Sequence, residues 1–134
     1  MRQRGQASIE YLIIVGFVTF LVISIFLIAY IYTGNLQNKI KTNQLETFGN
    51  KVVTTAETIF YSGEPSKTTL EVYLPAGVTN ITISGNNLII TYMAGASRGI
   101  RAYESKVNMT GSINPGPGIK KLSLEAKSDH VEIS

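Results

Sequence analysis

The chain has 134 residues, no cysteine and a single histidine. A fold stabilised by disulfides is therefore excluded, and a transition-metal site, which needs several Cys or His ligands, is not expected. The formal net charge of +3 includes Arg2 and Arg4, and without them ten basic residues stand against nine acidic ones. A charge so close to balance gives no reason to expect a nucleic-acid partner.

One long apolar stretch dominates the N-terminal quarter of the chain. From Tyr11 to Tyr32 no residue is charged, and only Gly16, Thr19 and Ser24 interrupt the run. As a helix these 22 residues would be about 33 Å long, enough to cross the ~30 Å hydrocarbon core of a bilayer. Irregular backbone is excluded there, because unpaired amides are costly in lipid. We therefore predict a helix that lies in a membrane at some stage.

The residues before this stretch predict its orientation and its processing. Arg2 and Arg4 form a positive start, which favours an N-terminus in the cytoplasm and the rest of the chain outside. The apolar stretch exceeds the core of an ordinary secretory signal, and no small-x-small cleavage site follows it. The plausible cut precedes it, between Gly5 and Gln6. Cleavage there would remove residues 1–5 as a leader and leave the apolar helix on the mature chain.

The motif Gln6-x-Ser8-x-Glu10, with a cut after Gly5 and a long apolar helix, resembles the class III signal of archaeal type IV pilin-like proteins. The family pattern continues with Leu four residues after the glutamate, where this chain has Ile14. The resemblance implies cleavage by a prepilin peptidase and assembly of copies into a helical surface filament. It also implies help from an assembly ATPase and platform proteins, and a role in assembly for Gln6, Ser8 and Glu10.

Glu10 is open to two interpretations. In the first, it is a carboxylate in the first turn of a helix, stabilised by the helix dipole at headgroup level, and needs no further role. In the second, Glu10 needs a partner, because drawing a carboxylate into an apolar environment costs about 2.5–3.5 kcal/mol. In the family that the chain resembles, this glutamate pairs with the N-terminal amine of a neighbouring subunit. Here that amine would belong to Gln6 after cleavage.

The helical pattern continues beyond the apolar stretch. Apolar residues recur from 36 to 60, mostly every three or four positions, with charged residues largely between them. We predict one helix over 6–61, with 6–32 as its apolar part and 33–62 as its amphipathic continuation. Gly34 and Gly49 are expected to be soft points or bends. The apolar stripe is expected to pack on the chain's own β domain, and contacts with neighbouring helices remain open.

Beyond the helix the sequence period becomes two. Gly63 is expected to cap the helix, and Pro65 prevents its continuation. The predicted strands, in chain order, are 67–74, 78–83, 88–93, a weaker one at 100–109, 119–126 and 130–133. The second and third form a hairpin, while 94–99 and 111–118 are predicted loops. The fold class predicted is α+β: a long N-terminal helix packed by a small antiparallel sheet of four to six strands over 63–134, as in type IV pilins.

The sequence offers no catalytic set, no cofactor motif and no metal-ligand spacing, and its one histidine, His130, is expected at the surface. It does contain two acceptor patterns for N-glycosylation, Asn80-Ile81-Thr82 and Asn108-Met109-Thr110. The predicted topology places both outside the membrane. Asn80 is expected to point outward from a strand, opposite Ile81.

Taken with the resemblance, these features predict a structural subunit of a surface filament, and the resemblance alone implies a role in adhesion. An alternative is a membrane-anchored extracellular β module, for example a minor pilin-like subunit or a solute-binding module that does not form the bulk filament. A third reading, a receptor for anionic polymers such as DNA, rests only on basic residues in the last third, for which a solvated face is the simpler explanation. These residues are Arg98, Arg101, Lys106, Lys120, Lys121 and Lys127.

Overall fold

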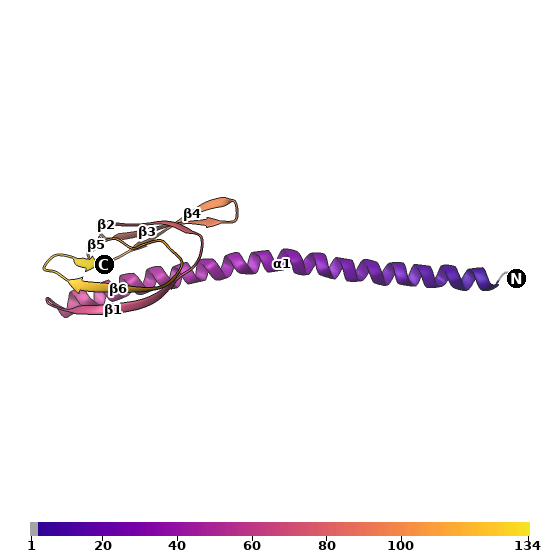
Figure 1. Cartoon of the computed structure of the whole chain (residues 1–134), viewed down its shortest axis with the longest axis horizontal. Coiled ribbons are helices and arrows are strands. Elements are labelled where there is room, and N and C mark those ends of the chain that lie inside the picture. Colours follow the sequence, from indigo (N-terminus) through magenta and orange to yellow (C-terminus); the bar gives the residue numbers. More distant parts are fainter. Residues whose placement is uncertain (1–2) are drawn as a thin grey trace. The chain divides into compact units, whose positions relative to one another are not determined.

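The computed structural model of the chain describes residues 3–134, with the backbone alone for residues 3–7 and 35. Arg2 of the predicted leader lies outside the described residues. One helix, α1 (Gln3–Ser62), is followed by seven strands (Figure 1). This layout confirms the predicted α+β class. The chain divides into two compact units, one ending at Gln37 and the other spanning Asn38–Ser134. We describe each by itself.

The first unit is the N-terminal part of α1. It is helical from Gln3, three residues before the predicted residue 6. Helical backbone continues through Gly34 in this unit and through Gly49 in the second. The end of α1 agrees with the prediction: Gly63 has a φ of 82°, and its N–H donates to the carbonyl of Phe60 at 3.1 Å. Such a left-handed residue terminates a helix without the steric penalty of a side chain.

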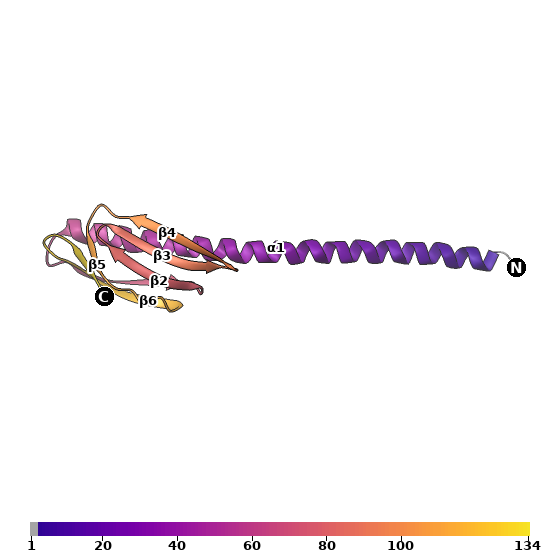
Figure 2. The same cartoon turned by 90° about the horizontal axis from the view of Figure 1, so that it is seen from above.

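The strands of the second unit form two sheets. Their bounds are β1 (Lys67–Leu74), β2 (Val78–Ser84), β3 (Asn87–Ala94), β4 (Ser97–Glu104), β5 (Met109–Gly111), β6 (Gly118–Ala126) and β7 (Val131–Ile133). The four-stranded sheet has the order β1-β6-β7-β5, and the three-stranded sheet is the meander β2-β3-β4, visible in Figure 2. Neighbours are antiparallel except for β5 and β7, which are parallel. The prediction of a single antiparallel sheet of four to six strands is therefore wrong in detail, because the strands form two sheets and one pair of them is parallel.

Two loop assignments also differ from the sequence prediction. The predicted loop at 94–99 is mostly strand, because Gly95, with a φ of 65°, lets β3 turn directly into β4. The weak strand predicted at 100–109 is two strands that belong to different sheets. Between them Ser105 is buried and donates its N–H to the carbonyl of Asn86 at 2.7 Å. The chain leaves the three-stranded sheet there and enters the other at Met109.

One hydrophobic core joins α1 to both sheets within the second unit. The helix supplies a buried stripe, the four-stranded sheet supplies alternate residues such as Leu74 and Leu124, and the three-stranded sheet supplies Leu88 and Ile90. The buried stripe of α1 is Leu45, Phe48, Val52, Val53, Ala56 and Ile59. This confirms that the amphipathic part of the helix packs on the chain's own β domain.

Gly49 has a packing role that the sequence does not indicate. A Cβ atom at this position would lie 2.5 and 2.6 Å from two ring carbons of Tyr103. The glycine therefore provides the space in which the aromatic ring of β4 rests on α1. Burial raises the pKa of the Tyr103 phenol, which is the expected effect of removing an ionisable group from water.

Candidate membrane and assembly segment

The apolar segment, residues Ile9–Tyr32 of α1, exposes every one of its large apolar side chains. Their exposed fractions run from 44% at Val15 to 83% at Tyr30. Phe48 and Val52, in the second unit, have exposed fractions of 0%. Soluble monomers rarely expose contiguous apolar surface on this scale, so the apolar segment requires a cover of lipid or protein.

The polar side chains inside the apolar segment are compatible with such a cover. The Thr19 hydroxyl donates to the Val15 carbonyl at 2.7 Å, and the Ser24 hydroxyl donates to the Phe20 carbonyl at 2.8 Å. Both hydroxyl groups are therefore satisfied within the helix and need no water. The segment pays no penalty for them in an apolar environment.

The ends of the apolar segment carry aromatic residues. Tyr11 stands at its start, and Tyr30 and Tyr32 stand at its end. About 20 residues of helix separate the two ends, or roughly 30 Å at 1.5 Å per residue, which matches the hydrocarbon thickness of a bilayer. Tyrosine favours the two membrane–water interfaces, because its ring is apolar and its hydroxyl is polar. By length and composition, α1 thus contains a segment able to cross a membrane.

Glu10 is exposed and precedes the run of uncharged residues directly. In the uncut chain α1 is helical from Gln3, and no acidic residue lies in its first described turn. Seven positions, or about two turns, separate Glu10 from Gln3. The effect of a helix dipole falls off within the first turn. In the uncut chain the dipole of α1 therefore contributes little at Glu10, and the pairing of this carboxylate with a partner stays a prediction.

Gly5, Gln6 and Ser8 are the other residues of the predicted cleavage and assembly motif. Gly5 and Gln6 belong to the helical backbone, so cleavage between them requires the start of α1 to unwind in the peptidase. Helix ends open at the lowest free energy, so this requirement is modest. Ser8 is exposed on the same helix. Cleavage and the assembly roles of these residues stay predictions.

Both glycosylation patterns lie on the surface of the second unit. Asn80 and Asn108 are exposed, while the residues between acceptor and threonine, Ile81 and Met109, are buried at 8% and 1% exposure. The Asn80 amide donates to the Thr82 hydroxyl at 3.2 Å. The outward direction predicted for Asn80 is thus confirmed, and modification itself stays a prediction.

The basic residues of the last third do not form one uncompensated surface. Lys121 pairs with Glu71 at 2.8 Å, and Lys127 donates to Glu125 at 2.5 Å. Arg98 and Arg101 lie on β4, in the other sheet. Ion pairs and separation weaken the field of such a patch, and binding of anionic polymers stays a prediction.

His130 and the acidic residues give no metal site in the described part of the chain. The His130 ring lies 2.5 Å from the carboxylate of its neighbour Asp129. Residues 3–134 contain no cluster of three or more His, Cys, Asp or Glu side chains placed to hold a metal ion.

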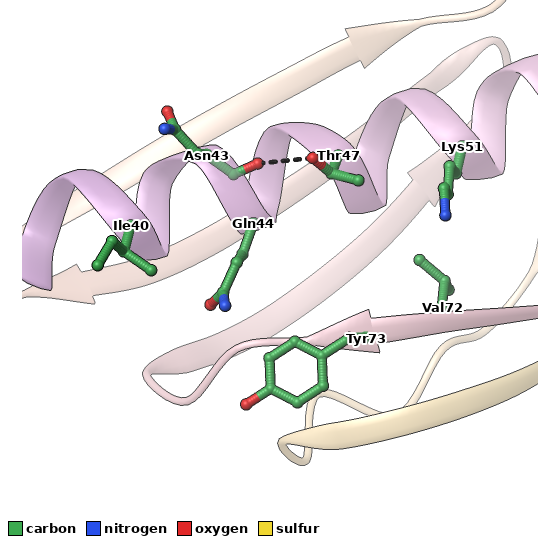
Figure 3. A pocket seen from close by; sticks show the side chains of 7 residues that line it. All are labelled: Ile40, Asn43, Gln44, Thr47, Lys51, Val72 and Tyr73. Carbon is green, nitrogen blue, oxygen red and sulfur yellow. Dashed lines mark hydrogen bonds between the residues drawn. The ribbon is translucent and has the colours of Figure 1, made fainter.

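One groove on the surface of the second unit was not predicted from the sequence. A groove of about 480 Å³ is lined by Ile40, Asn43, Gln44, Thr47 and Lys51 of α1 and by Val72 and Tyr73 of β1 (Figure 3). The apolar stripe was expected to bury Ile40, but its side chain is 54% exposed. The sequence does contain an indication of this exposure. The step from Ile40 to Leu45 is five residues, which breaks the spacing of three to four and turns Ile40 away from the buried stripe.

Comparison of the chain with protein-family models, curated proteins and solved structures gave no match.

Proposed function

We propose that the chain is the structural subunit of a type IV pilus-like surface filament. It is made as a membrane precursor, cleaved between Gly5 and Gln6, and polymerised through the apolar segment. The observation that carries this proposal is the exposure of every large apolar side chain of the apolar segment, on a helix that continues into a folded β domain. The Gln6-x-Ser8-x-Glu10 motif directly before that segment supports it.

The energetics of the apolar segment favour a polymer. Burial of one large apolar side chain contributes about 1.5–3 kcal/mol, so the segment as a whole represents tens of kcal/mol. A copy can leave the bilayer only if other copies replace the lipid around this surface. A heterologous contact that does not close into a ring then produces a filament. The β domain, with Asn80 and Asn108 on its surface, faces solvent and carries adhesion and glycans.

Glu10 supplies the specificity of this assembly. Among Ser8–Tyr32 it is the one charged side chain, so a bundle of apolar segments buries one carboxylate per copy. The amine that cleavage creates on Gln6 of a neighbouring copy neutralises it. Loss of one partner from a buried ion pair typically costs 3–5 kcal/mol, which ties assembly to prior cleavage.

The test is Glu10→Ala in the native host, with Glu46→Ala as the matched control. Glu46 is also an exposed carboxylate of α1, and it lies outside the apolar segment. Electron microscopy of sheared surface material and immunoblots of membranes report filament and precursor separately. We expect Glu10→Ala to give processed subunit in the membrane without filaments, and Glu46→Ala to give normal filaments.

Normal filaments from Glu10→Ala would contradict the assembly role of this residue. If wild-type cells hold all of the protein in membranes and none in filaments, the chain is a membrane-anchored β module or a minor subunit instead. The proposal of a major filament subunit would then be wrong.

A further inference from the structure

The last strand of the chain lies inside a sheet and not at its edge. β7 is placed between β5 and β6, parallel to β5 and antiparallel to β6. Its side chains Val131 and Ile133 have exposed fractions of 0% and 1%. The Ser134 N–H donates to the Ser123 carbonyl at 3.0 Å, and the Ser134 carbonyl accepts from the Ser123 N–H at 2.8 Å. The last residues of the chain therefore fill a slot that earlier elements form, and we call it the β7 slot.

Strand β5, one wall of the β7 slot, depends on β7 for its place in the sheet. In the described part of the chain β7 is the one strand paired with β5, and Met109 lies opposite Val131. The Val131 N–H also donates to the Asn108 carbonyl at 2.9 Å. At its start, β5 has one bond that does not involve β7: the Met109 N–H donates to the Gly85 carbonyl, in the turn between β2 and β3, at 2.8 Å. This bond holds the wall near its position when the slot is empty.

Gly111 gives the β7 slot its width. A Cβ atom at this position would collide with the carbonyl group of Ile133. The residue also has a φ of 125°, a conformation that favours glycine. Gly118, at the start of β6, has a similar φ of 119°, but a Cβ atom there would meet no other atom within 4 Å. A comparison of the two glycines therefore separates the need for space beside β7 from the need for an unusual backbone conformation.

We propose that the β7 slot is a strand-acceptor site, which stays open until the C-terminus is available and which β7 then closes as the last step of folding. During synthesis the N-terminal parts of a chain are available first. Short turns close the hairpins of β2, β3 and β4, whereas twenty positions separate Gly111 of β5 from Val131 of β7. Completion of the β domain is thereby tied to release of the whole chain.

Recognition in the β7 slot follows the chemistry of strand addition. Backbone hydrogen bonds on both sides of β7 give affinity, and the alternate side chains Val131 and Ile133 give specificity. The ligand is thus an extended segment with two aliphatic residues two positions apart. This property belongs to the β domain and does not depend on the proposed filament function.

The absence of cysteine from the sequence allows the occupant of the β7 slot to be trapped. A full-length chain carries Thr110→Cys and a protease recognition sequence between Ser128 and Asp129, two exposed residues of the turn before β7. It is cleaved, unfolded in urea and refolded in non-ionic detergent with an excess of a synthetic peptide of residues 129–134 that carries Glu132→Cys. Thr110 and Glu132 are exposed partners in the pairing of β5 with β7. Neighbouring strands lie about 4.8 Å apart, within reach of a disulfide bond.

We expect oxidation to join the peptide to the chain. Ala102→Cys in place of Thr110→Cys should give no such product, because Ala102 is an exposed residue of β4, in the other sheet. Val131→Asp in the peptide should abolish trapping, since a carboxylate would have to enter a buried position. Gly111→Ala in the chain should also abolish trapping, whereas the matched variant Gly118→Ala should retain it.

The order of folding is measured on the uncut wild-type chain by pulsed hydrogen exchange during refolding, with mass spectrometry of its fragments. We expect the amides of β5 and β7 to become protected after those of β2 and β3. Failure of Thr110→Cys to trap the peptide, equal trapping of the Val131→Asp peptide, or protection of β5 as early as the hairpin of β2 and β3 would overturn the proposal. None of these results bears on filament formation, which electron microscopy of cells tests separately.

Discussion

The contact between Gly49 and Tyr103 yields a prediction in which two effects of opposite sign compete. At an open helix position, Gly→Ala stabilises by about 1 kcal/mol. At Gly49 the new Cβ would lie 2.5 and 2.6 Å from two ring carbons of Tyr103, whereas carbon atoms in contact prefer about 3.5–4.0 Å. The ring must therefore move by about 1 Å.

The ring has little freedom to make that movement. Tyr103 packs against the core, and its backbone is held in β4 opposite Leu88. Overpacking of this kind costs about 1–3 kcal/mol. We therefore expect Gly49→Ala to destabilise the second unit by up to about 2 kcal/mol, after the gain in helix propensity is subtracted.

A double-mutant cycle separates the two effects. In a Tyr103→Ala background the obstruction is gone, so Gly49→Ala should stabilise by about 1 kcal/mol. Urea unfolding of the full chain in a non-ionic detergent, followed by circular dichroism, measures all four variants. Stabilisation by about 1 kcal/mol in both backgrounds would refute the contact. A spectroscopic titration adds a second readout, because a ring displaced into water should have its pKa moved back toward 10.0.

Two further predictions concern the surface of the β domain. The Lys127 ammonium lowers the pKa of Glu125 in the fold, so this pair contributes stability above the ordinary glutamate pKa of about 4.5 that is lost as the pH falls through the lower folded value. Urea midpoints of wild type and Glu125→Gln should therefore differ at pH 7 and converge in acid; a constant difference would contradict this. In the native host, Asn80→Gln and Thr82→Ala should each remove the same glycan mass from the intact protein, while Thr79→Ala should not. The same glycan mass on all three variants would exclude modification at Asn80.

Local features of the fold were readable from the sequence because they depend on short-range chemistry. The spacing of apolar residues predicted the long helix, and the capping residue Gly63 predicted its end. The turn residues between β2 and β3 predicted their hairpin. The pairing of sheets was not readable, because β1 joins β6 about fifty residues away, as in the pair Leu70 with Leu122. The alternation of apolar and polar residues along β1 does not show whether this strand pairs with β6 or with the neighbouring hairpin.

The candidate site divides in the same way. The apolar segment and Glu10 are evident from composition and spacing alone. The groove between α1 and β1 is not, because it joins Ile40 with Tyr73, two residues that are far apart in the sequence. Tyr103 on Gly49 is likewise a contact between distant positions, and the sequence shows only a glycine that lowers helix propensity.

The most direct test of the filament proposal is the N-terminal residue of the mature protein, determined by intact mass and peptide sequencing of sheared surface material. Cleavage between Gly5 and Gln6 predicts a chain that starts at Gln6, free of both leader arginines and with the amine that Glu10 requires. An intact Met1 on protein confined to membranes would remove that amine and contradict the proposal.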